Sequence, residues 1–177
     1  MKVDSYDVIV CGGGPVGMGL AIELGQRAIR TLVIERYPEP QPVPKGQNLT
    51  QRTMEHFRAW ECEQAVRAAR TIPSDYGIGG LTAYGTLMGD IWYDWLQRDL
   101  VREFYAADNE RLPQYATEAV LRARAAELPN VDIQYGLTVD RIEQDSATVT
   151  VFAKARDQRA SATSFTGHYA VGRDGSR

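Results

Sequence analysis

Short apolar runs, rather than alternation, mark the beginning of this chain. Residues 8–11 are apolar throughout, and residues 30–35 hold the run Leu32-Val33-Ile34. Runs of this kind predict strands that are covered on both faces of a parallel sheet. Residues 14–27 lie between them with apolar side chains on more than one side of a helix. The order strand, helix, strand therefore predicts an α/β fold with a right-handed crossover.

The pattern changes further along the chain. Helical spacing predicts helices over residues 50–70 and 113–128, and strand-like runs follow at residues 131–135, 138–143, 148–152 and 168–171. Four prolines within residues 37–44 predict an extended loop, because proline has no backbone donor. Residues 73–111 are rich in glycine and aromatic residues, which predicts short strands with glycine turns. We interpret this last segment as an insertion into the α/β rhythm.

A glycine-rich turn directly follows the first predicted strand. Gly12, Gly14 and Gly17 have the spacing G-x-G-x-x-G, and Pro15 and Val16 open the next helix. Gly12 permits the tight turn, Gly14 lets the backbone approach a pyrophosphate, and Gly17 lets the helix pack closely on the strand. The helix N-terminus points N–H groups and its positive dipole end at the same place.

An acidic residue completes this pattern. Glu35 ends the second predicted strand, 23 positions after Gly12, where it can accept hydrogen bonds from a ribose. Together the strand, the turn, the helix and the acid predict dinucleotide binding. The alternative is a glycine turn that only lets a strand meet a helix.

Composition narrows the function further. A chain of 177 residues with 44% hydrophobic content has room for one sizeable core, so we expect one domain or a little more. The net charge of −3 provides no basic surface, which argues against nucleic acid as a partner. The apolar runs are too short for a membrane span. Cys11 and Cys62 do not form a disulfide or metal pattern, so we expect a cytoplasmic protein without a metal site.

Four segments together carry a family resemblance: residues 12–17, 45–55, 112–118 with the pattern Gln-x-x-x-Glu, and 169–177 with the pair Asp174-Gly175. In these segments the chain resembles the class A flavoprotein aromatic hydroxylases, the single-component FAD monooxygenases related to para-hydroxybenzoate and phenol hydroxylases. The resemblance implies a Rossmann-like FAD-binding domain of the α/β class, interrupted by part of a β-rich substrate domain. Residues 1–75 would begin the FAD-binding domain, residues 76–111 would belong to the substrate-domain insertion, and residues 112–177 would continue the FAD-binding domain. The chain stops directly after the Asp-Gly pair, so we expect it to be incomplete.

The resemblance also implies roles for single residues. Backbone at positions 14–17 would hold the FAD pyrophosphate, Glu35 the adenosine ribose, and Arg36 would lie beside the adenine. Lys45 and Gln114 would lie near the phosphates and the ribityl chain. The full set of implied cofactor-binding residues is Gly12, Gly14, Pro15, Val16, Gly17, Glu35, Arg36, Lys45, Gln47, Gln114, Val139 and Asp174.

Two of these assignments have plain alternatives. Gln114, Glu118 and Arg122 are spaced i, i+4, i+8 and form one stripe of the predicted helix, which is otherwise a solvated face. Asp174 is otherwise part of an ordinary turn after a strand.

The activity that the resemblance implies is hydroxylation of a small phenolic or aromatic substrate. NAD(P)H would reduce FAD, O₂ would form a C4a-hydroperoxide on the flavin, and one oxygen atom would pass to the substrate. A homodimer of the full-length protein is compatible with this. No residue is a convincing base, so the catalytic residues stay unassigned. The alternatives are another FAD-dependent oxidoreductase of the same fold, such as a halogenase, oxidase or dehydrogenase, or a non-catalytic FAD-binding fragment.

Overall fold

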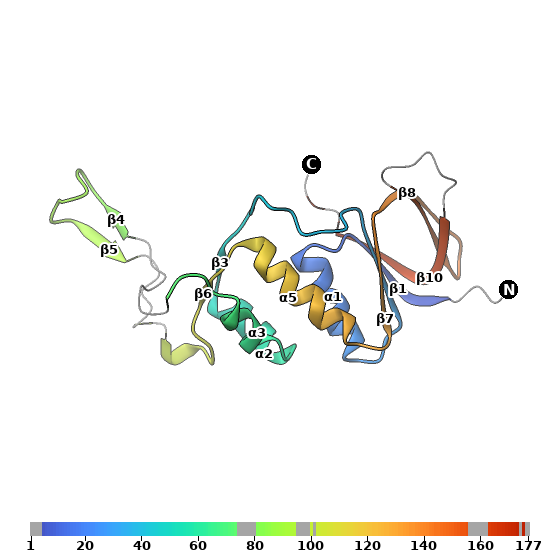
Figure 1. Ribbon diagram of the computed structural model, residues 1–177, viewed down its shortest axis with the longest axis horizontal. Coiled ribbons are helices and arrows are strands. Elements are labelled where there is room, and N and C mark those ends of the chain that lie inside the picture. The colour runs from blue at the N-terminus through green and yellow to red at the C-terminus, as the bar shows by residue number, and fades with distance from the viewer. Residues whose placement is uncertain are drawn as a thin grey trace. The chain divides into compact units, whose positions relative to one another are not determined.

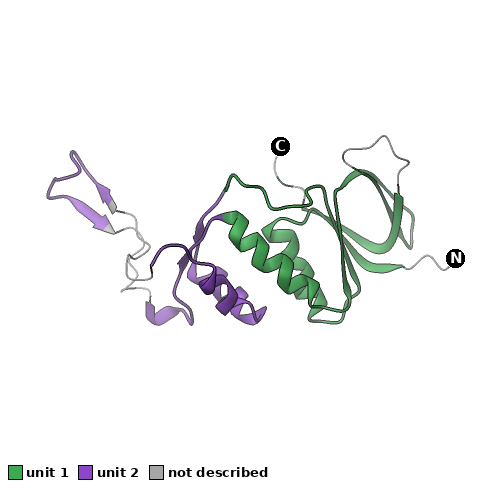
Figure 2. Ribbon diagram, in the orientation of Figure 1, with its two compact units in different colours: residues 1–45, 114–177 green, residues 46–113 purple. Residues whose placement is uncertain are grey.

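The computed structural model describes residues 5–73, 81–94, 100, 102–155, 163–173 and 175. The chain divides into two compact units, residues 1–45 with 114–177 and residues 46–113 (Figure 2). The first unit contains the strands β1 (Tyr6–Cys11), β2 (Thr31–Glu35), β7 (Val131–Tyr135), β8 (Leu137–Gln144), β9 (Val149–Ala155) and β10 (Thr163–Gly172), and the helices α1 (Pro15–Gly25) and α5 (Gln114–Ala126).

One six-stranded sheet organises the first unit, in the order β7-β2-β1-β10-β9-β8 (Figure 1). Strands β7, β2, β1 and β10 are parallel, whereas β9 is antiparallel to both β10 and β8. The β1–α1–β2 unit brings Val8 opposite Thr31 and Cys11 opposite Ile34. This parallel pairing confirms the α/β prediction made from the two apolar runs.

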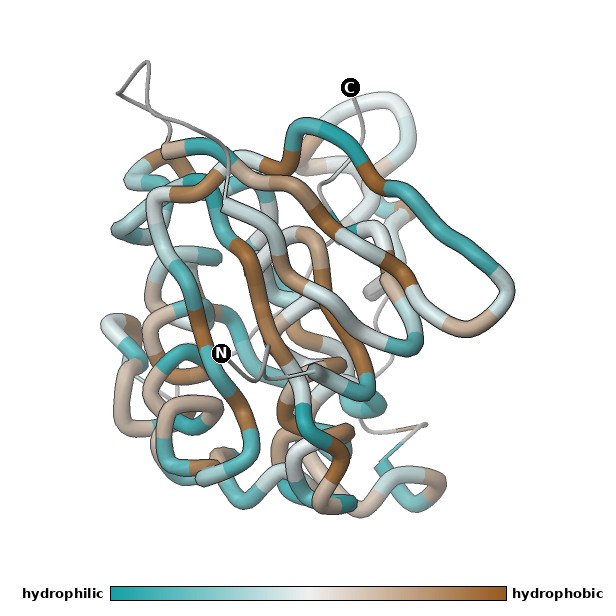
Figure 3. The backbone as a smooth tube through the Cα atoms, turned by 90° about the vertical axis from the view of Figure 1, so that its right-hand side faces the viewer, coloured by the Kyte–Doolittle hydropathy of each residue, from teal (hydrophilic) through white to brown (hydrophobic). Residues whose placement is uncertain are grey.

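The central strands are covered on both faces, which explains their continuous apolar sequence. Helix α1 packs on β1 and β2 and beside α5 (Figure 1). On the other face, Ile9 and Leu32 form a buried cluster with Val151 of β9. Strand β10 joins β9 to β1, because residues 163–167 pair with β9 and residues 167–172 pair with β1. Figure 3 shows the hydrophobic stretches along these strands.

The second unit contains the helices α2 (Gln51–Ala59) and α3 (Glu63–Ala68), the 3₁₀ helix η2 (Arg102–Phe104) and the strands β3 (Asn48–Leu49), β4 (Leu81–Ala83), β5 (Trp92–Asp94) and β6 (Glu110–Arg111). β3 pairs with β6, and β4 with β5, both antiparallel. These are short strands of the kind predicted for residues 73–111, although residues 74–80, 95–99 and 101 lie outside the described part. The assignment of residues 76–111 to a substrate domain stays a prediction.

The helical spacing predicted over residues 50–70 corresponds to two separate helices, α2 and α3. Glu61 adopts the left-handed conformation, with φ of 61°. The Cys62 N–H donates to the Phe57 carbonyl at 2.9 Å and the Glu61 N–H to the Arg58 carbonyl at 3.0 Å. This is a Schellman motif, which ends a helix and usually contains glycine at the left-handed position. Glutamate stands there instead, so the sequence carries no glycine signal for the break.

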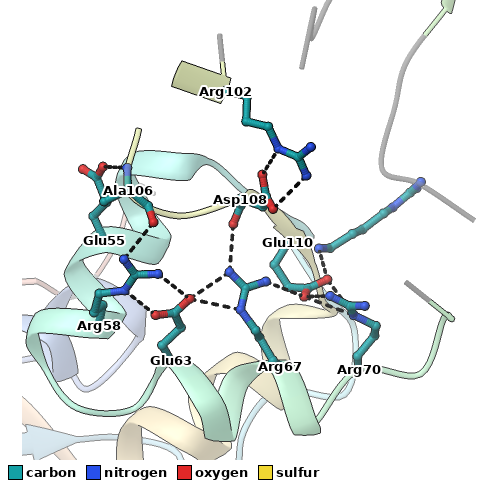
Figure 4. A network of polar contacts seen from close by, with 10 residues as sticks. Glu55, Arg58, Glu63, Arg67, Arg70, Arg102, Ala106, Asp108 and Glu110 are labelled. Atoms are coloured by element: carbon teal, nitrogen blue, oxygen red, sulfur yellow. Dashed lines mark hydrogen bonds and ion pairs between the residues drawn. The ribbon is translucent and has the colours of Figure 1, made fainter. Parts of the chain in front are cut away.

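An ion-pair network connects α2, α3 and β6 within the second unit (Figure 4). Glu63 accepts hydrogen bonds from Arg58 at 2.6 Å and from Arg67 at 2.8 Å, and the fully buried Glu110 pairs with Arg67 and Arg70. The hydrogen bond from Arg58 is the main reason why the pKa of Glu63 lies below its ordinary value of 4.5. The network therefore ties α2 and α3 to β6.

Candidate functional site

A pocket of about 450 Å³ lies in the first unit, where β1 and β2 end and α1 begins. This edge of a parallel sheet, at the carboxyl ends of the strands, is where α/β proteins bind their ligands. Ten of the twelve residues predicted to bind the cofactor line it: Gly12, Gly14, Pro15, Val16, Gly17, Glu35, Arg36, Lys45, Gln114 and Val139.

Two predicted residues are not placed in this pocket. Gln47 belongs to the second unit, where its backbone carbonyl accepts a hydrogen bond from the Leu112 N–H at 2.9 Å. Asp174 lies outside the described residues. Its neighbour Arg173 lines the pocket and donates its backbone N–H to the Cys11 carbonyl at 2.7 Å.

Each glycine of the turn has a different geometric task. Gly12 has a φ of 118°, which residues with a Cβ atom rarely adopt. Its N–H donates to the Ile34 carbonyl at 2.8 Å. A Cβ on Gly17 would lie 1.9 Å from the Gly12 carbonyl oxygen. A Cβ on Gly14 would meet no atom of the described residues within 4 Å, and Gly14 has a φ of −70°. Gly17 therefore permits close packing, whereas Gly14 leaves open space at the pocket wall.

The N-terminus of α1 supplies donors at this wall. The Met18 N–H donates to the Gly14 carbonyl at 2.9 Å, so the Val16 and Gly17 N–H groups precede this first hydrogen bond of the helix. Pro15 has no N–H, no side chain of the described residues caps the helix, and the first turn of the helix contains no acidic residue. Its positive dipole end thus remains suited to an anion.

Glu35 is held in place from two sides. The residue is 7% exposed, and its Oε2 accepts the Gly13 N–H at 2.6 Å while Oε1 accepts the Tyr37 N–H at 2.8 Å. A carboxylate has about four acceptor positions, so these two hydrogen bonds leave others for ribose hydroxyl groups. The two backbone donors orient Glu35 at the pocket wall.

Helix α5 forms a further part of the wall. The Gln114 Nε2 donates to Glu118 Oε1 at 2.7 Å, and Glu118 is buried. Arg122 donates to the Pro38 carbonyl at 2.8 Å and lies over the Tyr135 ring, 4.7 Å from its centroid. Burial raises the pKa of Tyr135, and the charge of Arg122 partly opposes that rise.

Glu118 and Arg122 both line the pocket, although neither was among the predicted site residues. Their spacing from Gln114 was the available signal, because positions i, i+4 and i+8 lie on one helix face. Helical spacing alone does not distinguish a face that lines a pocket from one that faces solvent.

The charges and shape of the pocket fit a dinucleotide such as FAD. The lining contains the cations Arg36, Lys45, Arg122 and Arg173 and the carboxylates Glu35, Glu39 and Glu118. The open space beside Gly14 and the uncapped helix end suit a pyrophosphate, and Glu35 suits a ribose. Among the described residues, no group of three or more His, Cys, Asp or Glu side chains could hold a metal ion. No described helix is long and apolar enough to cross a membrane.

The sequence matches the profile of the family described as "FAD binding domain" over residues 5–177. It is 32% identical over 181 residues to a putative polyketide hydroxylase of Streptomyces halstedii, covering 99% of this chain and 32% of that protein. A 3-(3-hydroxy-phenyl)propionate/3-hydroxycinnamic acid hydroxylase of Burkholderia vietnamiensis is 29% identical, with coverages of 100% and 31%. The crystal structure of aklavinone-11 hydroxylase with FAD and aklavinone matches with a TM-score of 0.81 and 26% identity, covering 99% of this chain and 34% of that one. The chain thus spans about a third of the length of these relatives.

Proposed function

Because this chain belongs to the FAD binding domain family, whose cofactor is FAD, we propose that it forms the adenosine-binding part of a flavoprotein monooxygenase. The complete protein would hydroxylate a phenolic or other aromatic substrate with NAD(P)H and O₂. The names of the similar hydroxylases support this reaction class, and one of them includes a hydroxyphenyl substrate. The proposal includes a cytoplasmic location, where the free cysteines Cys11 and Cys62 would stay reduced.

The pocket at the N-terminus of α1 is the observation that carries the proposal. The Val16 and Gly17 N–H groups would donate to the pyrophosphate, and the space beside Gly14 would let it approach the backbone. Glu35 would accept from the adenosine ribose, because its two backbone hydrogen bonds already hold it at the wall. Arg36 and Lys45 would add positive charge near the phosphates.

The chemistry that FAD supplies when bound is redox: two electrons come from NAD(P)H, and activated O₂ yields one oxygen atom for the ring and one for water. The residues of this chain contribute binding and orientation. By holding the adenosine and pyrophosphate, they would anchor one end of the cofactor so that its ring system reaches the rest of the protein.

Titration of the complete apo-protein with FAD, followed by flavin fluorescence, tests the binding. NAD(P)H oxidation with and without added phenols, together with identification of a hydroxylated product, tests the reaction. We expect tight FAD binding and phenol-stimulated oxidation. FAD binding without a hydroxylated product for any phenol would instead indicate another FAD-dependent oxidoreductase of the same fold, and absence of FAD binding would refute the proposal.

A further inference from the structure

Arg122 joins three separate elements at one wall of the pocket. It lies on α5, its Nη1 donates to the Pro38 carbonyl at 2.8 Å, and its guanidinium lies over the Tyr135 ring of β7. Pro38 precedes it by 84 positions in the sequence. The side chain therefore connects the segment after β2 to α5 and β7.

The segment that Arg122 holds has little regular structure of its own. Residues 37–45 contain no helix or strand, and the prolines at 38, 40, 42 and 44 have no N–H to donate. The same segment supplies Tyr37, Glu39, Gln41 and Lys45 to the pocket lining. A contact that fixes the Pro38 carbonyl thus constrains the pocket-lining residues on both sides of Pro38.

The Arg122 side chain also has an unfavourable feature. Its Nε is buried and makes no hydrogen bond among the described residues. Burying an N–H donor without an acceptor reduces stability, and an apolar side chain of similar length would avoid this loss. Stability alone would therefore favour methionine or leucine at this position, whereas arginine can also hold the Pro38 carbonyl.

We infer that Arg122 is a positioning residue for the cofactor: it holds residues 37–45 in place, so that the adenosine side of the pocket is formed before FAD binds. The inference rests on the proposed function. A preformed wall raises affinity because ordering of the segment does not have to accompany binding. Arg122 thus acts through the segment, rather than through the reacting atoms.

The test compares Arg122→Met, Arg122→Lys and wild type in the complete apo-protein. Methionine keeps an unbranched apolar stem but cannot donate to Pro38, and lysine keeps the charge but loses the planar guanidinium. Arg124→Met is the matched control on the same helix, since Arg124 pairs with Glu127 at 2.9 Å and does not line the pocket. The measurements are the FAD dissociation constant, the melting temperature without FAD, and the rate of tryptic cleavage after the exposed Lys45.

We expect Arg122→Met to bind FAD about tenfold or more weakly, which corresponds to the loss of one charged hydrogen bond. Its apo-protein should melt at the same or a higher temperature, and cleavage after Lys45 should become faster. Arg122→Lys should recover part of the affinity, and Arg124→Met should behave as wild type does.

Two results would overturn the inference: unchanged FAD affinity and cleavage in Arg122→Met, or a melting temperature that falls together with the affinity, as a purely structural role would produce. A wild-type protein that does not bind FAD would instead refute the proposed function. Cleavage after Lys45 in the apo-protein would still report on the contact between Arg122 and residues 37–45.

Discussion

Replacement of Gly17 by alanine should damage both the fold and the cofactor site. The added Cβ would lie 1.9 Å from the Gly12 carbonyl oxygen and 3.0 Å from its carbonyl carbon. Ordinary contact begins at 3.4 Å, so α1 and the glycine turn would have to separate by about 1.5 Å. Both obstacles are backbone atoms, which cannot move aside as the end of a flexible side chain can.

The size of this effect follows from packing energetics. Overpacking by extra methyl groups costs about 1–3 kcal/mol when side chains can adjust, so a clash with backbone should cost about 3 kcal/mol. The displacement also separates the N-terminus of α1 from the turn at Gly12 and from Glu35, which the Gly13 N–H holds at 2.6 Å. The donors for the pyrophosphate and the acceptor for the ribose would then no longer be aligned.

Gly14→Ala is the matched control within the same turn. Its Cβ meets no atom within 4 Å in the part of the chain that the structure describes, and a φ of −70° suits alanine. We expect its apo-protein to keep the wild-type melting temperature, while FAD binding weakens because the methyl group occupies space at the pocket wall. Gly17→Ala should lose both melting temperature and FAD affinity.

Thermal unfolding of the apo-proteins and fluorescence titration with FAD distinguish the two variants. Wild-type melting temperature and affinity in Gly17→Ala would refute the argument that this glycine permits close packing of α1 on β1. Full FAD affinity in Gly14→Ala would show that the pyrophosphate does not approach the turn at this residue.

Three further predictions concern other parts of the chain. Glu35→Ala should weaken FAD binding by about 1.5–3 kcal/mol, because the ribose loses a charged acceptor; unchanged affinity in a titration would show that Glu35 has no contact with FAD. Glu63 has a lowered pKa, so its contribution to stability is complete above its ordinary value of 4.5 and is lost as the pH falls through the folded-state pKa. Acid denaturation of Glu63→Gln should therefore depend less steeply on pH in that range than that of wild type, and identical slopes would contradict the ion-pair assignment. The 177-residue chain expressed alone should bind FAD poorly and self-associate, because Leu87 and Met88 are 94% and 93% exposed; a monomer in light scattering that carries flavin and oxidises NAD(P)H with a phenol would disprove this.

Much of the first unit could be predicted because its sequence signals are local. The apolar run of β1 and the glycine spacing of the following turn depend on neighbouring residues and on the period of a strand or helix. The prediction was less successful at Glu61, where the end of α2 depends on a left-handed residue that is usually glycine. The boundary of the second unit at residue 46 directly follows the proline-rich residues 37–44, which were predicted only as an extended loop.

The sequence by itself determined most elements of the first unit, the glycine-rich turn and the acid at the end of β2, because each follows from backbone sterics or from short-range periodicity. Residues 163–167 of β10 were not predicted as a strand. Only the tertiary structure decided which distant residues complete the pocket. Ile142 comes to it from β8, and Arg122 reaches Pro38 across 84 positions of sequence. Such contacts depend on how β7, β8 and α5 pack around β1 and β2, and packing of separate elements leaves no local pattern in the chain.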